Sequence, residues 1–355
     1  QQGALPESTL VAALLADLEA ALPLVWGRKV QTIFIGGGTP SLLAAATVAE
    51  LIAAIRARLD IVPGAEITLE ANPGTFERER FAAFAHAGVT RLSIGVQSFD
   101  DGCLQAIGRV HSADQAHAAT AEAKAHFGTY NLDLMYALPG QSRDLWQDSL
   151  RQALAYQPPH VSIYHLTLEP NTYFAKHPPA LPDEDTAYDM LDDVVAATAA
   201  SGLQRYEVSA FARPGHRSQH NLNYWQFGDY LGVGPGAHSK LSFAHRIIRQ
   251  VRLRDPQRYI SGAMAGRALS SSTEVSRRDL PFEFMLNALR LVDGFSLSDF
   301  SARTGLPTSS IEAGLSQGQS KGLLQRDGQH VHPTPRGMDF LSDLQALFLR
   351  DDGST

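Results

Sequence analysis

Apolar positions recur with two different periods along roughly the first two hundred residues of this chain. Leucines at positions 10, 14, 18 and 22 are four residues apart, which predicts a helix from Ser8 to about Leu22. Short apolar runs then alternate with longer amphipathic stretches, which predicts strands that alternate with helices. The predicted strands cover Val30–Ile35, Glu66–Leu69, Arg91–Val96, Asn131–Tyr136 and Val161–His165, with a last one at Tyr206–Ser209. The predicted helices between them cover residues 48–59, 76–86, 113–127, 145–156 and 183–200.

This alternation implies parallel βαβ units, arranged either as a doubly wound sheet or as a (β/α) barrel. Polar or glycine positions decide between the two arrangements, because in a barrel the C-terminal strand ends converge on one site. In a doubly wound sheet only the strands at the switch point would need such residues. Several strands carry them, at Gly36–Thr39, Glu70, Gln97, Asp133 and Tyr164–His165. The sequence therefore predicts an α/β fold with a partial barrel over residues 1–245.

The rhythm changes after about residue 245. An amphipathic segment at Pro281–Val292 is followed by two short predicted helices, Leu297–Thr304 and Ser309–Lys321. Two short strands then flank Asp327-Gly328, which is a hairpin signal. This order predicts a winged-helix-like domain over residues 246–355. Its second helix has a single basic residue, so a cover for substrate or a partner-binding module is favoured over DNA binding.

Composition narrows the classes of protein. The chain has 355 residues, of which 44% are hydrophobic and 19% charged, as in ordinary globular proteins. A formal net charge of −7 argues against nonspecific binding to nucleic acid or anionic lipid. The single cysteine, Cys103, excludes an intrachain disulfide and suits a reducing compartment. No run of about 18 apolar residues and no signal-peptide pattern is evident. We therefore expect a cytoplasmic protein without a membrane span.

Candidate ligand-binding residues stand at the ends of the predicted strands. Gly36, Gly37 and Gly38 precede Thr39, and their backbone N–H groups could meet a carboxylate or phosphate, although a tight turn is the alternative. Glu70 ends an apolar strand, where an acid is costly to bury without a partner, so it could accept from a ligand ammonium or ribose; a helix N-terminal acid or a salt-bridge partner is the alternative. Asp133 lies inside an apolar strand and is hard to explain as solvent-facing, so it is a further candidate site residue. The amide of Gln97 suits a sugar or adenine edge, and Arg109 suits a carboxylate. A loop cap and a surface ion pair are their respective alternatives.

A second candidate site is the aromatic string His220-Asn221-Leu222-Asn223-Tyr224-Trp225. Its rings could stack on a flat macrocycle, and its histidine could ligate haem iron. A buried aromatic corner with a satisfied histidine is the alternative. The other histidines considered show no zinc-binding spacing; they are His111, His117, His126, His160, His330 and His332.

Together these motifs resemble the HemW and oxygen-independent coproporphyrinogen oxidase family of radical S-adenosylmethionine (SAM) proteins. The resemblance rests on residues 32–42, 70–75, 93–99, 131–135, 138–141 and 220–225, in that order. The last of these segments is typical of the HemW branch. The resemblance implies a partial (β/α)₆ barrel, a C-terminal winged-helix-like domain, and SAM lying across the strand ends.

The resemblance also implies roles for individual residues. Gly37, Gly38 and Thr39 would meet the methionine end of SAM, and the rest of SAM would be held by Glu70, Gln97, Arg109 and Asp133. Haem would lie near His220, Asn221, Tyr224 and Trp225. The implied partners are SAM, haem or a porphyrinogen, and a haem-acceptor protein, which can be transiently associated with a membrane.

The family holds a [4Fe–4S] cluster through a C-x-x-x-C-x-x-C loop that follows the first barrel strand. Here Cys103 stands alone, so that strand and the cluster cysteines are expected upstream of Gln1. A natural loss of the cluster is the alternative. As given, the chain is not expected to cleave SAM. The leading functional hypothesis is a haem chaperone; the others are an oxygen-independent coproporphyrinogen III oxidase and a cluster-less binding or regulatory barrel.

Overall fold

The structure is a computed structural model that describes residues 7–38, 40–74, 78–168, 170 and 173–349. Its contacts divide the chain into two compact units. We call residues 31–52 and 62–217 the sheet unit, and residues 1–30, 53–61 and 218–355 the second unit. The domain boundary expected at residue 245 stays a prediction.

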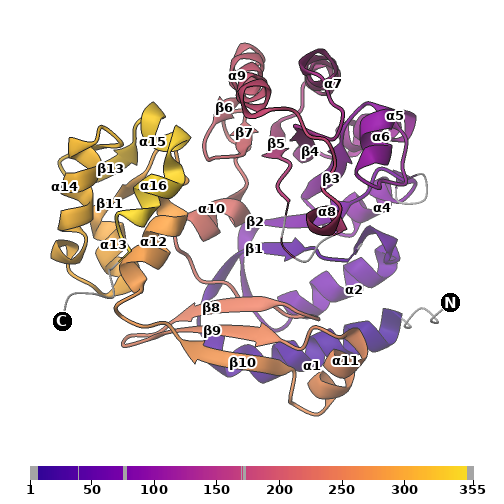
Figure 1. Cartoon of the computed structure of the whole chain (residues 1–355). Coiled ribbons are helices and arrows are strands. Elements are labelled where there is room, and N and C mark those ends of the chain that lie inside the picture. The colour runs from indigo at the N-terminus through magenta and orange to yellow at the C-terminus, as the bar shows by residue number, and fades with distance from the viewer. Residues whose placement is uncertain (1–6, 39, 75–77, 169, 171–172, 350–355) are drawn as a thin grey trace. The chain divides into compact units, whose positions relative to one another are not determined.

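The sheet unit is built on a curled sheet whose seven described strands have the order β1-β2-β3-β4-β5-β7-β6 (Figure 1). The pairs β2–β3, β3–β4 and β4–β5 are parallel, whereas β7 pairs antiparallel with both β5 and β6. The strand bounds are β1 Lys29–Ile35, β2 Asp60–Ala71, β3 Arg91–Gln97, β4 Tyr130–Tyr136, β5 His160–His165, β6 Gln204–Arg205 and β7 Ala210–Ala212.

Helices cover one face of this sheet (Figure 1). They are α2 Ala45–Arg56, α4 Phe81–His86, α6 Ala113–His126, α7 Arg143–Ala155 and α9 Glu184–Ala200. The sheet unit also contains α5 Asp101–Ala106, α8 Tyr173–Lys176 and a 3₁₀ turn at Pro40–Leu42. Strand residues such as Leu92 and Leu132 pack in one buried cluster with Phe84 and Trp146 from the helices. Burial of this apolar face provides the main stabilisation of the sheet unit, because apolar surface leaves water on both the strands and the helices.

Local signals explain where several helices begin. Ser112 starts α6 with a capping box, in which its hydroxyl accepts from Gln115 N–H and the Gln115 side chain accepts from Ser112 N–H. Ser142 and Asp183 cap α7 and α9 in the same manner, each with one side-chain bond to the first turn. The helix predicted from residue 76 is described from Phe81 onward, and its predicted start lies outside the described residues.

The strand predicted at Tyr206–Ser209 is wrong. These residues form the connection between the antiparallel strands β6 and β7. The Glu207 carboxylate accepts from Ser209 N–H at 3.0 Å, and Tyr206 N–H donates to Ala210 O at 3.1 Å. A tight reversal therefore replaces the sixth parallel strand that a regular β/α repeat would supply.

The second unit contains two further three-stranded antiparallel sheets among its described residues. The first joins β8 His238–Ser242, β9 Ile247–Arg252 and β10 Leu269–Glu274, and was not predicted. The second joins β11 Phe295–Ser296, β12 Leu324–Asp327 and β13 His330–Pro333. The helices are α1 Glu7–Val25, α10 Gln219–Trp225, α11 Pro256–Met264, α12 Leu280–Ala288, α13 Leu297–Thr304, α14 Glu312–Ser320, α15 Pro335–Asp339 and α16 Leu341–Ala346, with a 3₁₀ turn at Thr308–Ser310.

Helix α1 corrects one expectation from the sequence. By length and composition it is apolar enough to cross a membrane, with a mean hydropathy of 1.7 over its best window. Leucine and valine contribute most of this hydropathy and alanine adds to it, while Asp17, Glu19 and Pro23 interrupt the apolar run. In the structure α1 packs against α11, where Ala13 lies in one buried cluster with Tyr259. Its buried Asp17 accepts from Tyr259 Oη at 2.9 Å and pairs with Arg252.

Candidate functional site

The face of the parallel strands that carries the predicted site is polar. Side chains at directly paired positions of neighbouring strands point to the same side of a sheet. The register pairs Glu70 with Ser93, Ser93 with Asn131, Asn131 with His160, and Asp133 with Ser162. The alternate positions, such as Leu69, Leu92 and Leu132, belong to the buried apolar cluster. Strand periodicity thus places polar side chains from four strands on one face.

The glycine run meets this face at Glu70. Gly37 N–H donates to Glu70 Oε2 at 2.9 Å. A Cβ at Gly36 would lie 2.8 Å from the same oxygen and 2.5 Å from Phe34 Cε1, so no larger residue fits there without movement. Gly37 and Gly38 have φ values of +76° and +56°, which favour glycine. Thr39, the next predicted site residue, lies outside the described residues.

Asp133 is held by two neighbours on the same face. Its carboxylate accepts from Asn131 Nδ2 at 2.8 Å and from Ser93 Oγ at 3.1 Å. Burial raises the pKa of Asp133 to about 6, although both bonds act to lower it. Glu70 raises the pKa of Asp133 further, whereas Arg109 lowers it. The side chain nevertheless keeps some accessible surface, so one side of it can meet a ligand.

Gln97 and Arg109 complete the predicted set. Gln97 lies at the end of β3 with φ +66°, a left-handed conformation that costs free energy for a residue other than glycine. Strain of this kind often marks a functional position. Burial lowers the pKa of Arg109, and attraction to Asp133 opposes this shift. Its guanidinium makes no hydrogen bond or ion pair with another described residue.

These residues can hold a zwitterionic ligand. Glu70 and Asp133 offer acceptors for an ammonium or for hydroxyl groups, and Arg109 offers donors for a carboxylate. A shallow surface groove also exists between α7 and α9, lined by residues such as Leu150, Leu154 and Ala197. It lies on the helices, not on the polar face of the strands, and carries none of the predicted residues.

The aromatic string forms α10 in the second unit. Ser218 caps this helix, because its hydroxyl accepts from Asn221 N–H at 3.2 Å. The backbone of Asn221, a predicted site residue, therefore helps to start the helix. His220 and Tyr224, one turn apart, meet edge to face with ring centroids 5.0 Å apart. Tyr224 also contacts Tyr230, with ring centroids 4.5 Å apart. Burial raises the pKa of Tyr224 to about 12, so its hydroxyl keeps its proton.

The aromatic face of Trp225 contacts a cation, whereas the polar N–H at its edge is buried. The guanidinium of Arg290 lies 4.3 Å from the centre of its ring, which is a cation–π contact. The buried Nε1 of Trp225 has no hydrogen-bond partner among the described residues. A buried indole N–H normally finds a partner, so this atom is a candidate donor to a bound molecule.

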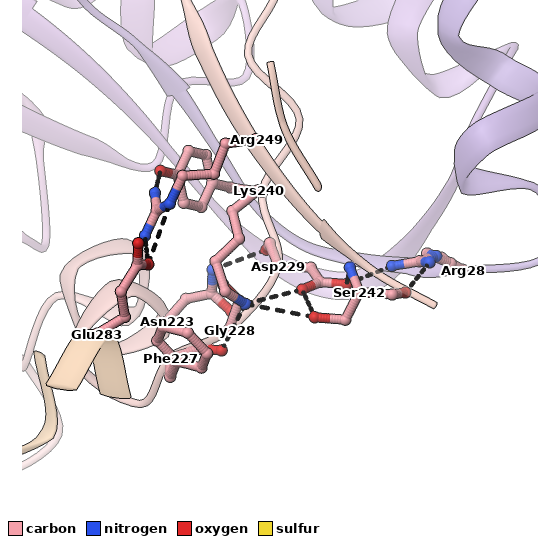
Figure 2. Close-up of polar contacts among 10 residues, drawn as sticks. Arg28, Asn223, Phe227, Gly228, Asp229, Lys240, Ser242, Arg249 and Glu283 are labelled. Carbon is pink, nitrogen blue, oxygen red and sulfur yellow. Dashed lines mark hydrogen bonds and ion pairs between the residues drawn. The ribbon is translucent and has the colours of Figure 1, made fainter. Parts of the chain in front are cut away.

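A partly buried ion-pair network around the buried Lys240 fixes the chain just after α10 (Figure 2). Lys240 Nζ donates to Phe227 O at 3.0 Å and to Asp229 Oδ1 at 3.1 Å. Asp229 also accepts from Arg28 and from the backbone and side chain of Ser242. Figure 2 shows Lys240 pointing at the reversal formed by Phe227, Gly228 and Asp229.

The network reaches back into the string through Asn223. Asn223 Nδ2 donates to Asp229 O at 2.9 Å, and Gly228 N–H donates to Asn223 O at 2.7 Å. A Cβ at Gly228 would lie 2.0 Å from Asn223 Oδ1, so this contact requires glycine. Asn223 therefore fixes the end of α10.

Sequence reasoning missed several residues of both sites. Asn131, His160 and Tyr206 on the polar face, and Arg290 and Lys240 near α10, were not singled out for a role. A period of two places Asn131 beside Asp133, and this was the one available signal. The remaining partners lie far away in sequence and depend on strand register or tertiary packing.

A metal centre does not fit the described residues. No group of three or more His, Cys, Asp or Glu side chains among them could hold a metal ion. Cys103 is buried, and burial together with Asp100 raises the pKa of its thiol to about 12. A thiol that keeps its proton is a poor ligand for iron or zinc.

Comparisons with known proteins agree with this description. The profile of the Radical SAM superfamily matches residues 13–153, and that of the HemN C-terminal domain matches residues 275–340. The chain is 44% identical to the heme chaperone HemW of Escherichia coli (strain K12), over 99% of this chain and 92% of that protein. It is 41% identical to the heme chaperone HemW of Haemophilus influenzae, with coverages of 99% and 92%.

A solved structure resembles the whole fold. The coproporphyrinogen III oxidase HemN of Escherichia coli, described as a radical SAM enzyme, aligns with a TM-score of 0.80. The alignment covers 96% of this chain and 83% of that chain at 22% identity, so it bears on the fold alone. The predicted α/β fold is thereby confirmed at the level of a curled half-barrel sheet with a further C-terminal domain.

Proposed function

Because this chain belongs to the radical SAM superfamily, in the branch of HemW-type haem chaperones, we propose that it binds haem and delivers it to acceptor haemoproteins. The observation that carries this proposal is the similarity to HemW proteins over nearly the whole chain. The arrangement of α10 supports it, because a partly accessible histidine stands beside Tyr224 and close in sequence to Trp225. An imidazole can ligate haem iron, and aromatic faces can stack on the porphyrin.

His220 is the proposed haem ligand, and the full chain with His220→Ala tests it. We expect the variant to weaken haem binding by at least about tenfold, as measured by absorbance titration in the Soret region, because one axial bond is lost. The matched control is His245→Ala, which removes an exposed histidine of the same unit. Haem affinity and spectrum that stay unchanged in the first variant would show that His220 is not the ligand.

The polar face of the sheet unit is the proposed SAM site. The residues present fit this molecule: Arg109 has donors free for its carboxylate, and Glu70 and Asp133 have acceptors for its ammonium and ribose hydroxyls. Gly37, Gly38 and Gln97 would line the same ligand, and Thr39 joins them as a prediction from sequence. Glu70, Asp133 and Arg109 would hold SAM at this face, where it would be the cofactor for the radical chemistry of the superfamily.

A [4Fe–4S] cluster does not fit the residues of this sequence, since the single thiol is that of Cys103 and it is buried. We therefore propose that this chain binds SAM. We also propose that the fold is the partial (β/α)₆ barrel of the superfamily. Helices α13 and α14 followed by the β12–β13 hairpin would be a winged-helix-like module for a partner or substrate.

The match of residues 275–340 to the HemN C-terminal domain family favours a second candidate function, the SAM-dependent oxidative decarboxylation of coproporphyrinogen III. This reaction needs a reduced cluster, so the deciding assay is anaerobic and uses a chain extended by a C-x-x-x-C-x-x-C segment on which the cluster has been reconstituted. Protoporphyrinogen IX formation would favour the oxidase, and its absence alongside haem binding would favour the chaperone. We further propose a cytoplasmic location, on the net charge of −7 and the single cysteine.

A further inference from the structure

A chain of buried hydrogen bonds runs along the polar face of the sheet unit and ends at Asp133. Tyr206 Oη lies 2.8 Å from His160 Nε2, and His160 Nδ1 lies 2.7 Å from Asn131 Oδ1. Asn131 Nδ2 donates to Asp133 Oδ1 at 2.8 Å. Tyr206 and His160 are at most 1% exposed, so water does not compete for these bonds.

The donor and the acceptor can be assigned for every hydrogen bond in this series. Asn131 must turn its amide nitrogen toward Asp133, because its oxygen would be repelled by the carboxylate. Its oxygen therefore faces His160, which must carry a proton on Nδ1 and accept on Nε2. Tyr206 is then the donor to Nε2. Ser162 Oγ also donates to Asn131 Oδ1, at 3.1 Å, and supports the same orientation.

The imidazole stays neutral, as this direction requires. Burial lowers the pKa of His160 well below its usual value, and the positive charge of Arg91 together with His216 lowers it further. A second proton on Nε2 would remove the acceptor for Tyr206. The charged groups that act on Asp133 itself are Glu70 from β2 and Arg109 from the loop after α5.

We propose that Tyr206, His160 and Asn131 are positioning residues of the SAM site, which hold the Asp133 carboxylate in one orientation with its acceptors turned to the ligand. This inference rests on the proposed SAM site and adds residues to it. Oδ1 receives Asn131 and Oδ2 receives Ser93, so the carboxylate plane is fixed from two sides. The remaining lone pairs are left for ligand N–H or O–H donors.

A buried hydrogen-bond network that served only stability would not need to end at the Asp133 carboxylate. A polar network inside a sheet is stable when all its members are satisfied, whatever group ends it. Here three successive hydrogen bonds, each donated in the direction of Asp133, end at its carboxylate. Burial raises the pKa of this carboxyl to about 6, and the residue remains partly accessible. The donors lower the proton affinity of Asp133, which keeps it an acceptor near neutral pH.

The test variant is Tyr206→Phe, which removes the first donor and keeps the ring. Without that donor, His160 can move its proton to Nε2 and Asn131 can turn, so an oxygen would then face Asp133. We expect the protonation midpoint of Asp133, followed by infrared difference spectroscopy and assigned with Asp133→Asn, to move upward. We also expect SAM, titrated calorimetrically into the full chain, to bind about tenfold more weakly near neutral pH.

The matched control is Tyr130→Phe, which removes the hydroxyl of another buried tyrosine of the sheet unit. Its Oη donates to Tyr156 O at 3.5 Å and has no link to Asp133. Should Tyr206→Phe fail to fold, Ser162→Ala removes the second donor to Asn131 and should shift Asp133 in the same direction.

The positioning role of Tyr206 and the binding of SAM at Asp133 can be rejected independently. A midpoint for Tyr206→Phe that moves no more than for Tyr130→Phe would overturn the positioning role. A wild-type chain that binds no SAM, while Asp133 still responds to Tyr206→Phe, would support the hydrogen-bond chain and reject SAM as its ligand.

Discussion

Asp133 carries an electrostatic cost that makes stability depend on pH. Burial raises the pKa of its carboxyl from 3.8 to about 6. Between these values the folded protein binds more protons than the unfolded chain, so this group lowers stability as the pH rises. An asparagine does not titrate, so Asp133→Asn should gain stability relative to the wild type between about pH 4 and pH 7, by up to ~3 kcal/mol. Urea unfolding of both proteins across this range measures the change, whatever constant offset the substitution adds.

Asp183 provides a control, because the pKa of its carboxyl is shifted in the opposite direction from that of Asp133. Bonds from Thr186 at the start of α9 lower the pKa of its carboxyl. Its contribution to stability is therefore present above the unfolded pKa and is lost only toward strongly acidic pH. Asp183→Asn should give a deficit that stays constant over the range in which Asp133→Asn changes. A pH-independent difference for Asp133→Asn would contradict the cost of burial assigned to Asp133.

At the scale of residues, the sequence revealed the acids but not their partners. Glu70 and Asp133 could be chosen because an acid in an apolar strand needs an explanation. His160 was weighed only as a zinc ligand, and its bond to Asn131 spans 29 positions. That bond depends on the register between β4 and β5, in which a slip by one residue would turn every side chain to the other face.

At the scale of elements, α10 should depend on Lys240. This side chain is 3% exposed, and it donates to carbonyls at the end of α10 and to Asp229. Lys240→Met leaves these acceptors unsatisfied, so we expect a loss of about 3–5 kcal/mol in the free energy of unfolding. Amide hydrogen exchange should also become faster in α10. Denaturant unfolding and exchange measured on the full chain check both effects.

Lys124→Met is the matched control for this substitution. Lys124 is exposed, and its Nζ donates to Tyr156 O at 2.9 Å. Because water can replace a surface donor, the expected loss is within about 0.5 kcal/mol. Equal losses in the two lysine variants would mean that the Asp229–Lys240 network does not hold α10.

The regular β/α part of the chain could be predicted and the irregular parts could not. Strands β3 to β5 and helices α6, α7 and α9 lie close to their predicted ranges, because apolar periodicity and capping residues mark them directly. Strands β8 to β10 escaped prediction. The sequence of β10, Leu269–Glu274, does not alternate between apolar and polar residues. Every residue of this strand is exposed. Its pairing with β9 alone makes it a strand.

At the scale of the molecule, the two candidate sites belong to different compact units. The contacts described for Asp133 come from the sheet unit, including Glu70, Ser93 and Asn131. The contacts described for His220, Tyr224 and Trp225 come from the second unit, including Tyr230 and Arg290. The contacts named for the two sites therefore have no residue in common.

We therefore expect the two binding functions to be separable by single substitutions. Asp133→Asn should weaken SAM binding by about tenfold or more, because a charged acceptor is lost, and should leave the haem Soret band and haem affinity unchanged. His220→Ala should weaken haem binding and leave the affinity for SAM unchanged. If the two sites act independently, the double variant should combine the two losses. Calorimetric titration with SAM and absorbance titration with haem, made on the same four proteins, would test this. A strong loss of haem binding in Asp133→Asn would instead reveal coupling between the sites, and the double variant would then deviate from additivity.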